Sequence, residues 1–326
     1  MENFEFIEEV IKQNNSFLLT SHVNPDADAI GSEIALYEIL KKLGKKVFII
    51  NHSNTPDNLK FLDNNNAIEI YEPEVHDEII NRVDAVFILD LNRLNRLVRM
   101  EKIVRSQNKP IICIDHHQDP ESFTEYHFGG IEYSSTGAIL YRINKELNLV
   151  ELDKDVAIPI YAAVFTDTGG FRYERTTPKT HIMAAELLKV GVDPNYIIEM
   201  IYERSKPSKL RLLGSILNTL TLVNDGRICY MKVTRQMLKD VGANENETEG
   251  FINYTMSIEG VKIGLFFYEV ENGIKISFRS RDNIHINKLA SEFGGGGHIY
   301  AAGARLFDVA LDEFIPKVLK SAEKYL

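Results

Sequence analysis

Short apolar runs alternate with helical patterns along the first part of the chain. Four runs of strand length lie at residues 17–20, 47–50, 85–89 and 111–114. Between the first two runs, apolar residues recur at helical spacing from Ile30 to Leu43, and Gly44 ends this pattern. The run at 85–89 is apolar throughout, as expected for a parallel strand that is buried on both faces. The pattern predicts an α/β domain with a parallel sheet and flanking helices.

The pattern changes in the second half of the chain. Helical spacing from Asn195 to Leu222 is interrupted near Pro207, and because proline disrupts a helix interior, we place the connection between two domains there. Beyond it the sequence predicts three strands, at 228–233, 261–267 and 274–280. A chain of 326 residues is long enough for two domains. We predict an α/β domain at 1–192, a helical linker at 193–212 and a smaller α+β domain at 213–326.

A histidine and two aspartates lie between the first apolar run and the first helical pattern. His22, Asp26 and Asp28 occupy this strand-to-helix turn, and in open α/β sheets such turns bind ligands. Asp26 and Asp28 are two residues apart in what should be extended backbone, so their side chains should diverge and could serve two metal ions. Helix capping by one aspartate is the alternative, but it leaves the histidine and the second aspartate unexplained.

Further side chains that can bind metals follow the later elements. Asp90 comes directly after the run at 85–89, and Asp115, His116 and His117 follow the run at 111–114. Asp167 follows a predicted buried helix. Each of these alone could be a helix cap or a polar turn. Because neighbouring parallel strands end at the same edge of a sheet, we expect these side chains to converge on one crevice.

Two other features predict anion binding. Arg172 lies close behind Asp167, where we expect it to contact a substrate phosphate rather than a metal ion. Near the other end of the chain, four consecutive glycines precede a histidine: Gly294, Gly295, Gly296, Gly297 and His298. A flexible linker is the alternative, but apolar residues flank the run, and no Lys-Ser/Thr pair follows as in a P-loop. We expect a loop whose backbone N–H groups bind phosphate oxygens.

The charge of the chain limits its partners. There are 37 basic and 47 acidic residues, which gives a net charge of −10. This charge argues against binding of long nucleic acid but is compatible with binding of short anionic ligands. Cys113 and Cys229 lie far apart without C-x-x-C spacing, which indicates a reducing compartment. The chain opens with an acidic segment and contains no apolar run near the ~18 residues of a membrane span. We therefore expect a cytoplasmic protein that does not bind membranes.

Taken together, these motifs resemble those of the DHH phosphoesterase superfamily, which is named for a triplet such as Asp115, His116 and His117. The first motif runs from His22 to Ser32, and Asp90, the triplet, the segment around Asp167 and the glycine run follow in the family's order. The resemblance covers nearly the whole chain. It is strongest to the stand-alone nanoRNase and pAp-phosphatase branch, although related stand-alone enzymes that cleave pApA and c-di-AMP share the architecture.

The resemblance implies a site with two metal ions in the cleft between the two domains. One ion would be held by His22, Asp26 and Asp90, and the other by Asp28, Asp90, His116 and Asp167, with Asp90 as the bridge. His117 would contact the scissile phosphate, with Asp115 orienting one of the two histidines. Arg279 and His298, together with Gly295, Gly296 and Gly297, would bind the substrate. Carboxylate and imidazole ligands without thiolate fit two Mn²⁺ ions best, although Mg²⁺, Co²⁺ or Fe²⁺ could also bind.

The function implied by the resemblance is hydrolysis of very short RNA or DNA oligonucleotides to mononucleotides and of pAp to AMP. We expect a homodimer. A phosphodiesterase for c-di-AMP or pApA is the main alternative. A manganese pyrophosphatase would carry an Arg-Lys-Lys type motif in place of the glycine run, and a non-catalytic nucleotide-binding regulator would tolerate loss of ligands that are all present in this chain.

Overall fold

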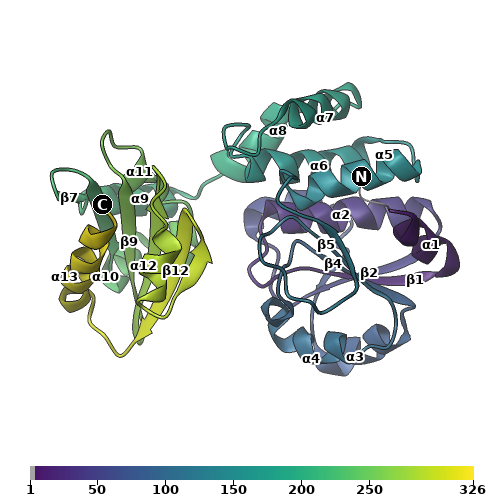
Figure 1. The fold of residues 1–326 in the computed structure, drawn as a ribbon, viewed down its shortest axis with the longest axis horizontal. Coiled ribbons are helices and arrows are strands. Elements are labelled where there is room, and N and C mark those ends of the chain that lie inside the picture. Colours follow the sequence, from purple (N-terminus) through teal and green to yellow (C-terminus); the bar gives the residue numbers. More distant parts are fainter. Residues whose placement is uncertain (1–3) are drawn as a thin grey trace. The chain divides into compact units, whose positions relative to one another are not determined.

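The chain forms two units, each with its own sheet and hydrophobic core (Figure 1). The computed structural model describes residues 4–326, apart from the side chain of His298. The division falls between Arg204 and Ser205, inside the segment predicted as a linker. Among the described residues, no helix combines the length and the apolar character needed to cross a membrane.

The first unit is built on a parallel sheet of six strands in the order β3-β2-β1-β4-β5-β6. The strands are β1 (Ser16–Thr20), β2 (Lys46–Asn51), β3 (Ile68–Ile70), β4 (Ala85–Leu89), β5 (Ile111–Asp115) and β6 (Tyr126–Gly129). The direction in which strands are added reverses between β1 and β4, and open α/β sheets bind ligands at such a switch point. The predicted α/β class is confirmed.

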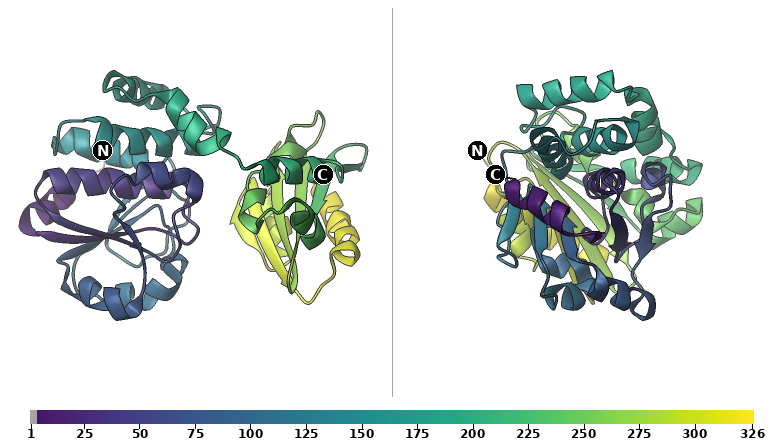
Figure 2. Two further views of the ribbon diagram at one scale, coloured as in Figure 1. Left: turned by 180° about the vertical axis from the view of Figure 1, so that it is seen from behind. Right: turned by 90° about the vertical axis from the view of Figure 1, so that its right-hand side faces the viewer.

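Helices cover both faces of this sheet (Figures 1 and 2). One face carries α1 (Glu5–Gln13), α2 (Ala27–Lys42), α5 (Thr136–Leu147) and α6 (Lys154–Asp167), and the other carries α3 (Pro73–Arg82) and α4 (Glu101–Arg105). Within β1, Phe17 and Leu19 face the first layer and Leu18 the second. Burial on both sides explains why the central strands are continuous apolar runs. The helices α7 (Pro178–Lys189) and α8 (Pro194–Ile198) and a π-helical turn, Glu199–Glu203, complete the unit.

Two glycines allow the helices that carry the polar motifs to approach each other closely. Gly31 lies in α2, where an added Cβ would sit 2.5 Å from the carbonyl oxygen of Pro159 in α6. At the start of α5, a Cβ on Gly137 would sit 2.6 Å from the Cβ of Ala163, also in α6. Both distances are too short for real contacts, so α2, α5 and α6 can pack at this spacing only with glycine there.

The second unit contains a six-stranded sheet in the order β11-β12-β10-β9-β8-β7, antiparallel except for the parallel pair of β8 and β9. Its strands are β7 (Thr221–Val223), β8 (Ile228–Val233), β9 (Ile263–Val270), β10 (Gly273–Ser280), β11 (Gly296–His298) and β12 (Ala301–Phe307). The helices α12 (Ile286–Ser291) and α13 (Leu311–Ala322) pack on one face, and α9 (Pro207–Leu217), α10 (Arg235–Val241) and α11 (Asn253–Met256) on the other.

The prediction of three strands in this unit missed the other three. Two of them, β7 and β11, have only three residues each, and β12 is rich in alanine and glycine, so none shows the apolar pattern of a strand. The expected glycine loop is also partly wrong. Gly296, Gly297 and His298 form an edge strand that pairs with β12, since the backbone of this segment finds partners there.

Candidate metal centre

The predicted polar residues gather at one edge of the parallel sheet, on both sides of the switch point. His22 follows β1, Asp90 follows β4, and Asp115 ends β5 with His116 and His117 directly after it. Asp26 and Asp28 begin α2, and Asp167 ends α6. Their ligand atoms form three groups, each within 4.8 Å: His22, Asp26 and Asp90; Asp28, His116 and Asp167; and Asp90, His116 and His117. Asp90 therefore belongs to two groups, as does His116.

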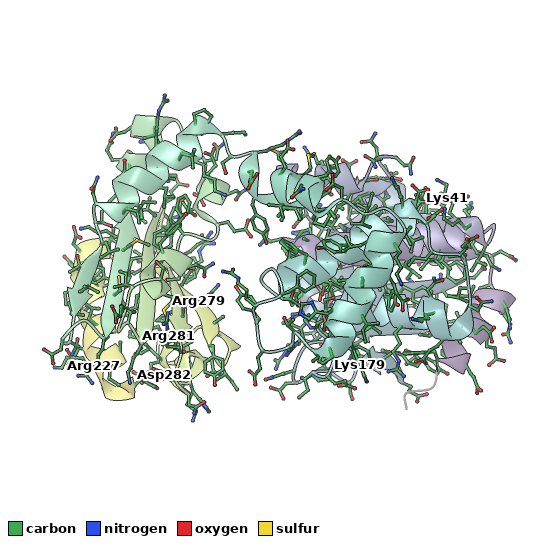
Figure 3. The ribbon with its side chains drawn as sticks, turned by 90° about the horizontal axis from the view of Figure 1, so that it is seen from above. Lys41, Lys179, Arg227, Arg279, Arg281 and Asp282 are labelled. Atoms are coloured by element: carbon green, nitrogen blue, oxygen red, sulfur yellow. The ribbon has the colours of Figure 1, made fainter. Side chains whose placement is uncertain are left out.

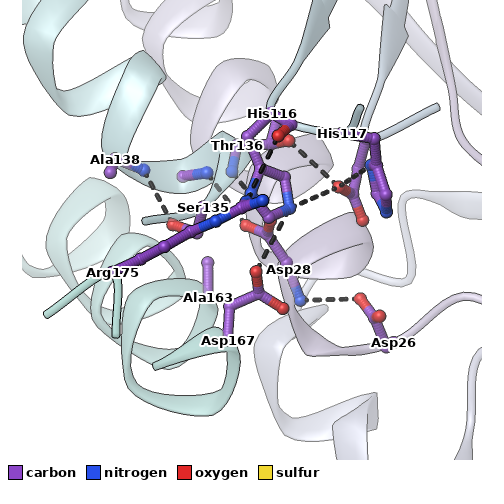
Figure 4. A network of polar contacts seen from close by, with 12 residues as sticks. Asp26, Asp28, His116, His117, Ser135, Thr136, Ala138, Ala163, Asp167 and Arg175 are labelled. Atoms are coloured by element: carbon purple, nitrogen blue, oxygen red, sulfur yellow. Dashed lines mark hydrogen bonds and ion pairs between the residues drawn. The ribbon is translucent and has the colours of Figure 1, made fainter. Parts of the chain in front are cut away.

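The two aspartates of the first motif are held in different ways (Figure 4). Asp26 caps α2, because its Oδ1 accepts the backbone N–H groups of Asp28 and Ala29 at 3.0 and 3.1 Å. Asp28 already lies in the first turn of α2, so the expectation of extended backbone was wrong at this residue. Its two oxygens accept the N–H groups of Thr136 and Gly137 at the start of α5, at 2.7 and 2.9 Å. Capping and metal binding are therefore compatible, since each carboxylate keeps lone pairs for an ion.

Asp90 lies at the centre of the cluster. Its Oδ2 is 3.3 Å from Nε2 of His22, and its Oδ1 is 3.6 Å from Nε2 of His116 and accepts the hydroxyl of Thr136 at 3.0 Å. The residue has a φ of 57°, in the left-handed region that costs energy for any residue with a side chain. Burial opposes ionisation, but the hydrogen bond with His22 and the charges of the histidines outweigh it and lower the pKa of Asp90. The side chain is thus a fixed carboxylate.

His116 faces the carboxylates of the second group. Its Nε2 lies 3.1 Å from Oδ2 of Asp167 and 3.5 Å from Oδ2 of Asp28. On its other side, Nη1 of Arg175 lies 2.8 Å from Nδ1 and 3.3 Å from the carbonyl oxygen of His116. Burial lowers the pKa of His116 to about 4, so its ring is neutral at pH 7. Because a guanidinium only donates hydrogen bonds, Nδ1 of His116 is the acceptor in the metal-free structure. If Nε2 bound a metal ion, the neutral ring would carry its proton on Nδ1. Arg175 would then donate to the carbonyl oxygen of His116 alone.

His117 has different partners from its neighbour. Its Nδ1 lies 2.7 Å from Oδ1 of Asp115, and its backbone N–H donates to Oδ2 of the same carboxylate at 3.2 Å. Burial acts against the charged ring, but the hydrogen bond to Asp115 and the charges of Asp90 and Asp115 raise the pKa of His117 to about 9. Asp115 thus holds His117 in one orientation as an imidazolium.

The electrostatics of the cluster fit divalent cations. Burial, followed by repulsion from Asp90, raises the pKa of both Asp28 and Asp167. Bringing Asp26, Asp28, Asp90 and Asp167 together therefore costs free energy unless positive charge compensates them. The donor set consists of carboxylate oxygens and imidazole nitrogens, which bind Mn²⁺, Fe²⁺, Co²⁺ and Zn²⁺. The residues present thus fit divalent cations of this kind.

The remaining predicted residues lie elsewhere in the fold. Arg172 is exposed in the turn after α6, where its Nε donates to the carbonyl oxygen of Gly169 at 2.7 Å. Arg279 extends from β10 of the second unit (Figure 3), and its Nη1 donates to the carbonyl oxygen of Phe278. The glycine run joins α12 to β11. The side chain of His298 lies outside the described part of the chain.

Sequence reasoning missed three residues that support the cluster. Thr136 binds Asp28 and Asp90, and Ser135 caps α5 by accepting the N–H of Ala138 at 3.0 Å. The run Ser134, Ser135, Thr136 and Gly137 is a helix-start signal that could have indicated this position. Arg175 contacts His116, but nothing in the sequence distinguishes it from other nearby basic residues such as Arg172.

Comparisons with known proteins agree with this geometry. Residues 16–164 match the DHH family, N-terminal domain, and residues 225–326 match the DHHA1 domain. The chain is 32% identical over 326 residues to the bifunctional oligoribonuclease and PAP phosphatase NrnA of Thermus thermophilus, covering 100% of this chain and 95% of the relative. The NrnA of Bacillus subtilis is 27% identical over 300 residues, with 90% of each chain covered.

Among solved structures, an exopolyphosphatase-related protein from Bacteroides fragilis superposes with a TM-score of 0.95 at 32% identity. The match covers 99% of this chain and 96% of that one. Similarity of this extent, together with the order of the two matched domains and the polar cluster at the switch point, establishes the family. The chain belongs to the DHH family, with an N-terminal DHH domain followed by a DHHA1 domain.

Proposed function

We propose that this protein is a two-metal phosphoesterase that hydrolyses very short oligonucleotides to mononucleotides and dephosphorylates pAp to AMP. The observation that carries the proposal is the position of Asp90 at the switch point of the sheet, with Oδ2 3.3 Å from Nε2 of His22 and Oδ1 3.6 Å from Nε2 of His116. The names of the full-length relatives, oligoribonuclease and PAP phosphatase, support the choice of substrates.

One ion would be held by His22, Asp26 and Asp90, and the other by Asp28, Asp90, His116 and Asp167. We propose Mn²⁺ for both positions, with Mg²⁺, Co²⁺ or Fe²⁺ as ions that the same ligands accept. When bound, such a pair of ions activates water as a nucleophile and stabilises negative charge on the phosphate. Asp28 accepts two N–H groups from the N-terminus of α5, and Asp26 accepts N–H groups at the start of α2. These hydrogen bonds fix both carboxylates before any ion binds.

His117 is proposed to act on the substrate rather than as a ligand. The charged ring, fixed by Asp115, can donate an N–H group to an oxygen of the scissile phosphate and so stabilise the charge that develops on it. Nδ1 of His117 is already engaged by Oδ1 of Asp115 at 2.7 Å, which supports a role other than metal binding. Asp115 is thus a positioning residue.

Substrate binding is assigned to residues of both units. We propose that Arg172 and Arg279 bind phosphate oxygens through paired N–H donors, and that Gly295, Gly296, Gly297 and His298 also contact the substrate. We also propose that the protein is a cytoplasmic homodimer; both cysteines are free and buried, as a reducing compartment favours. Light scattering on the full-length chain tests the dimer.

The experiment that tests the function compares kcat/KM for five substrates. Purified protein with Mn²⁺ is incubated with RNA dinucleotides, pAp, pApA, c-di-AMP and pyrophosphate. The proposal expects the highest values for pAp and for RNA dinucleotides of several sequences. A clear preference for c-di-AMP or pApA over these substrates would favour the related phosphodiesterase activity, and binding without turnover of any substrate would favour a nucleotide-binding regulator.

A further inference from the structure

One face of the second unit's sheet combines bare backbone with positive charge near its β11 edge. Side chains of β10 and β12 alternate between the core under α12 and α13 and the opposite face. The residues on that opposite face are Lys275, Ser277 and Arg279 on β10, and Gly303, Arg305 and Phe307 on β12. A shallow hollow of about 480 Å³ lies here, lined by parts of β10, β12 and the glycine run.

The glycines of this region differ in what the fold requires of them. Gly294 and Gly297 have φ values of 70° and 143°, which only glycine adopts readily, and a Cβ on Gly295 would lie 2.2 Å from the carbonyl oxygen of Gly303. Gly296 and Gly303 have no such constraint. An added Cβ meets nothing within 4 Å at Gly296 and only a backbone oxygen at 3.6 Å at Gly303.

Gly296 and Gly303 are also paired across β11 and β12, so together they form a flat patch without side chains, the glycine floor. Glycine inside a strand weakens it, and neither residue is needed for backbone geometry or packing. Their lack of a side chain therefore points to a ligand that approaches the backbone closely.

Cationic and aromatic groups lie beside the glycine floor. Lys275 and Arg305 are directly paired in register, and both line the hollow. Nζ of Lys275 lies 3.8 Å from Oε2 of Glu245 and 5.9 Å from the centroid of the Tyr268 ring. Arg305 lies over the ring of Phe307, with its Cζ 5.2 Å from the centroid, and Phe307 is 62% exposed. An exposed aromatic ring beside paired cations is the arrangement that single-stranded nucleic acids bind.

We propose that this face binds the third and later nucleotides of an oligonucleotide substrate. Lys275 and Arg305 hold one internucleotide phosphate, the sugar and base cross the glycine floor, and a base stacks on Phe307. Lys275 lies four residues from Arg279 along β10, about 13 Å at the usual rise of a strand, so the two contact different phosphates. The inference rests on the proposed function, because it assigns the part of the substrate beyond the first two nucleotides.

The test compares a 5′-phosphorylated RNA dinucleotide with a tetranucleotide. In the full-length chain carrying both Lys275→Ala and Arg305→Ala, the ratio of kcat/KM for the tetranucleotide to that for the dinucleotide should fall about tenfold. As a control, a chain with Arg227→Ala and Lys239→Ala loses two positive charges elsewhere in the unit and should keep the wild-type ratio.

Phe307→Ala should weaken tetranucleotide binding at least about fivefold, and Phe307→Tyr should restore it.

Binding without divalent ions separates this inference from the proposed function. Binding of a fluorescein-labelled tetranucleotide is measured at several salt concentrations. In the variant with Lys275→Ala and Arg305→Ala, the slope of log Kd against log salt concentration should be smaller by about 0.7, the value for one lost phosphate contact. Gly303→Ala should weaken binding without lowering Tm, because the fold has room for the methyl group. If wild type hydrolyses neither length, the proposed function is wrong and binding still decides the inference. Equal tetranucleotide affinity in wild type, the double variant and Gly303→Ala would overturn the inference.

Discussion

At the scale of single residues, the proposed metal centre depends most on Asp90, whose carboxylate lies 3.3 Å from Nε2 of His22 and 3.6 Å from Nε2 of His116. We predict that Asp90→Asn binds neither ion tightly and loses about 10²-fold or more in kcat, because one substitution weakens both sites. Asparagine tolerates the left-handed φ of 57°, so Tm of the metal-free protein should change little. Elemental analysis of the purified variant measures its metal content. Two equivalents of metal with normal turnover would rule out Asp90 as the shared ligand.

His117 offers a second test, through its protonation. Because the pKa of His117 is raised to about 9, its imidazolium stabilises the metal-free fold below the ordinary pKa of 6.5, and this contribution is lost as pH rises through about 9. We predict that Asp115→Asn returns the pKa of His117 toward 6.5, as measured by NMR titration of the metal-free protein.

His117→Ala should keep both metals and lose turnover. Loss of one metal equivalent in His117→Ala would instead identify His117 as a ligand.

The sequence predicted most individual residues of the cluster but not their support. His22, Asp90 and the 115–117 triplet stand directly after apolar runs, so their place at the sheet edge follows from local pattern. Thr136 and Arg175 are 46 and 59 residues from their partners Asp90 and His116, and only the packing of α5 and the turn after α6 brings them there. Local pattern carries no signal for such contacts.

At the scale of elements, the close packing of α2 against α6 brings Asp28 near Asp167. We predict that Gly31→Ala destabilises the protein by about 1–3 kcal/mol, because the new Cβ would overlap the Pro159 carbonyl group. It should also weaken binding of the ion that we assign to Asp28 and Asp167. Gly214→Ala in α9 is the matched control: it has open space and should be neutral or stabilising by about 0.5–1 kcal/mol. Thermal unfolding measures both, and equal Tm values would refute the packing argument.

Element prediction succeeded where burial imposes a clear pattern. The buried strands β1, β4 and β5 and the helix α2 were predicted, since each is an apolar run or a helical repeat. The edge strands β3 and β6 were missed, because they are short and only partly buried, and their sequences are mixed. At the glycine run, the absence of side chains leaves no pattern, and pairing with β12 decides the structure.

At the scale of the whole molecule, the net charge of −10 is expected to limit substrate length. Longer oligonucleotides gain no general electrostatic attraction from such a surface, so the local cationic residues must supply the binding energy.

The two-unit organisation was predictable from chain length and the change of pattern near Pro207, and the structure divides the chain between Arg204 and Ser205. The relative roles of the two units could not be predicted from pattern and followed only from resemblance to a family.

The most direct test of the central claim is a length series of kcat/KM, from dinucleotides to about 24 nucleotides, with Mn²⁺ on wild type and Arg279→Ala. We predict high efficiency for wild type up to about five nucleotides and a steep fall beyond. We also predict that Arg279→Ala loses dinucleotide cleavage while its metal content stays at the wild-type level, because Arg279 is assigned to substrate phosphate and not to an ion. Equal wild-type efficiency at every length, or normal dinucleotide cleavage by Arg279→Ala, would contradict the central claim.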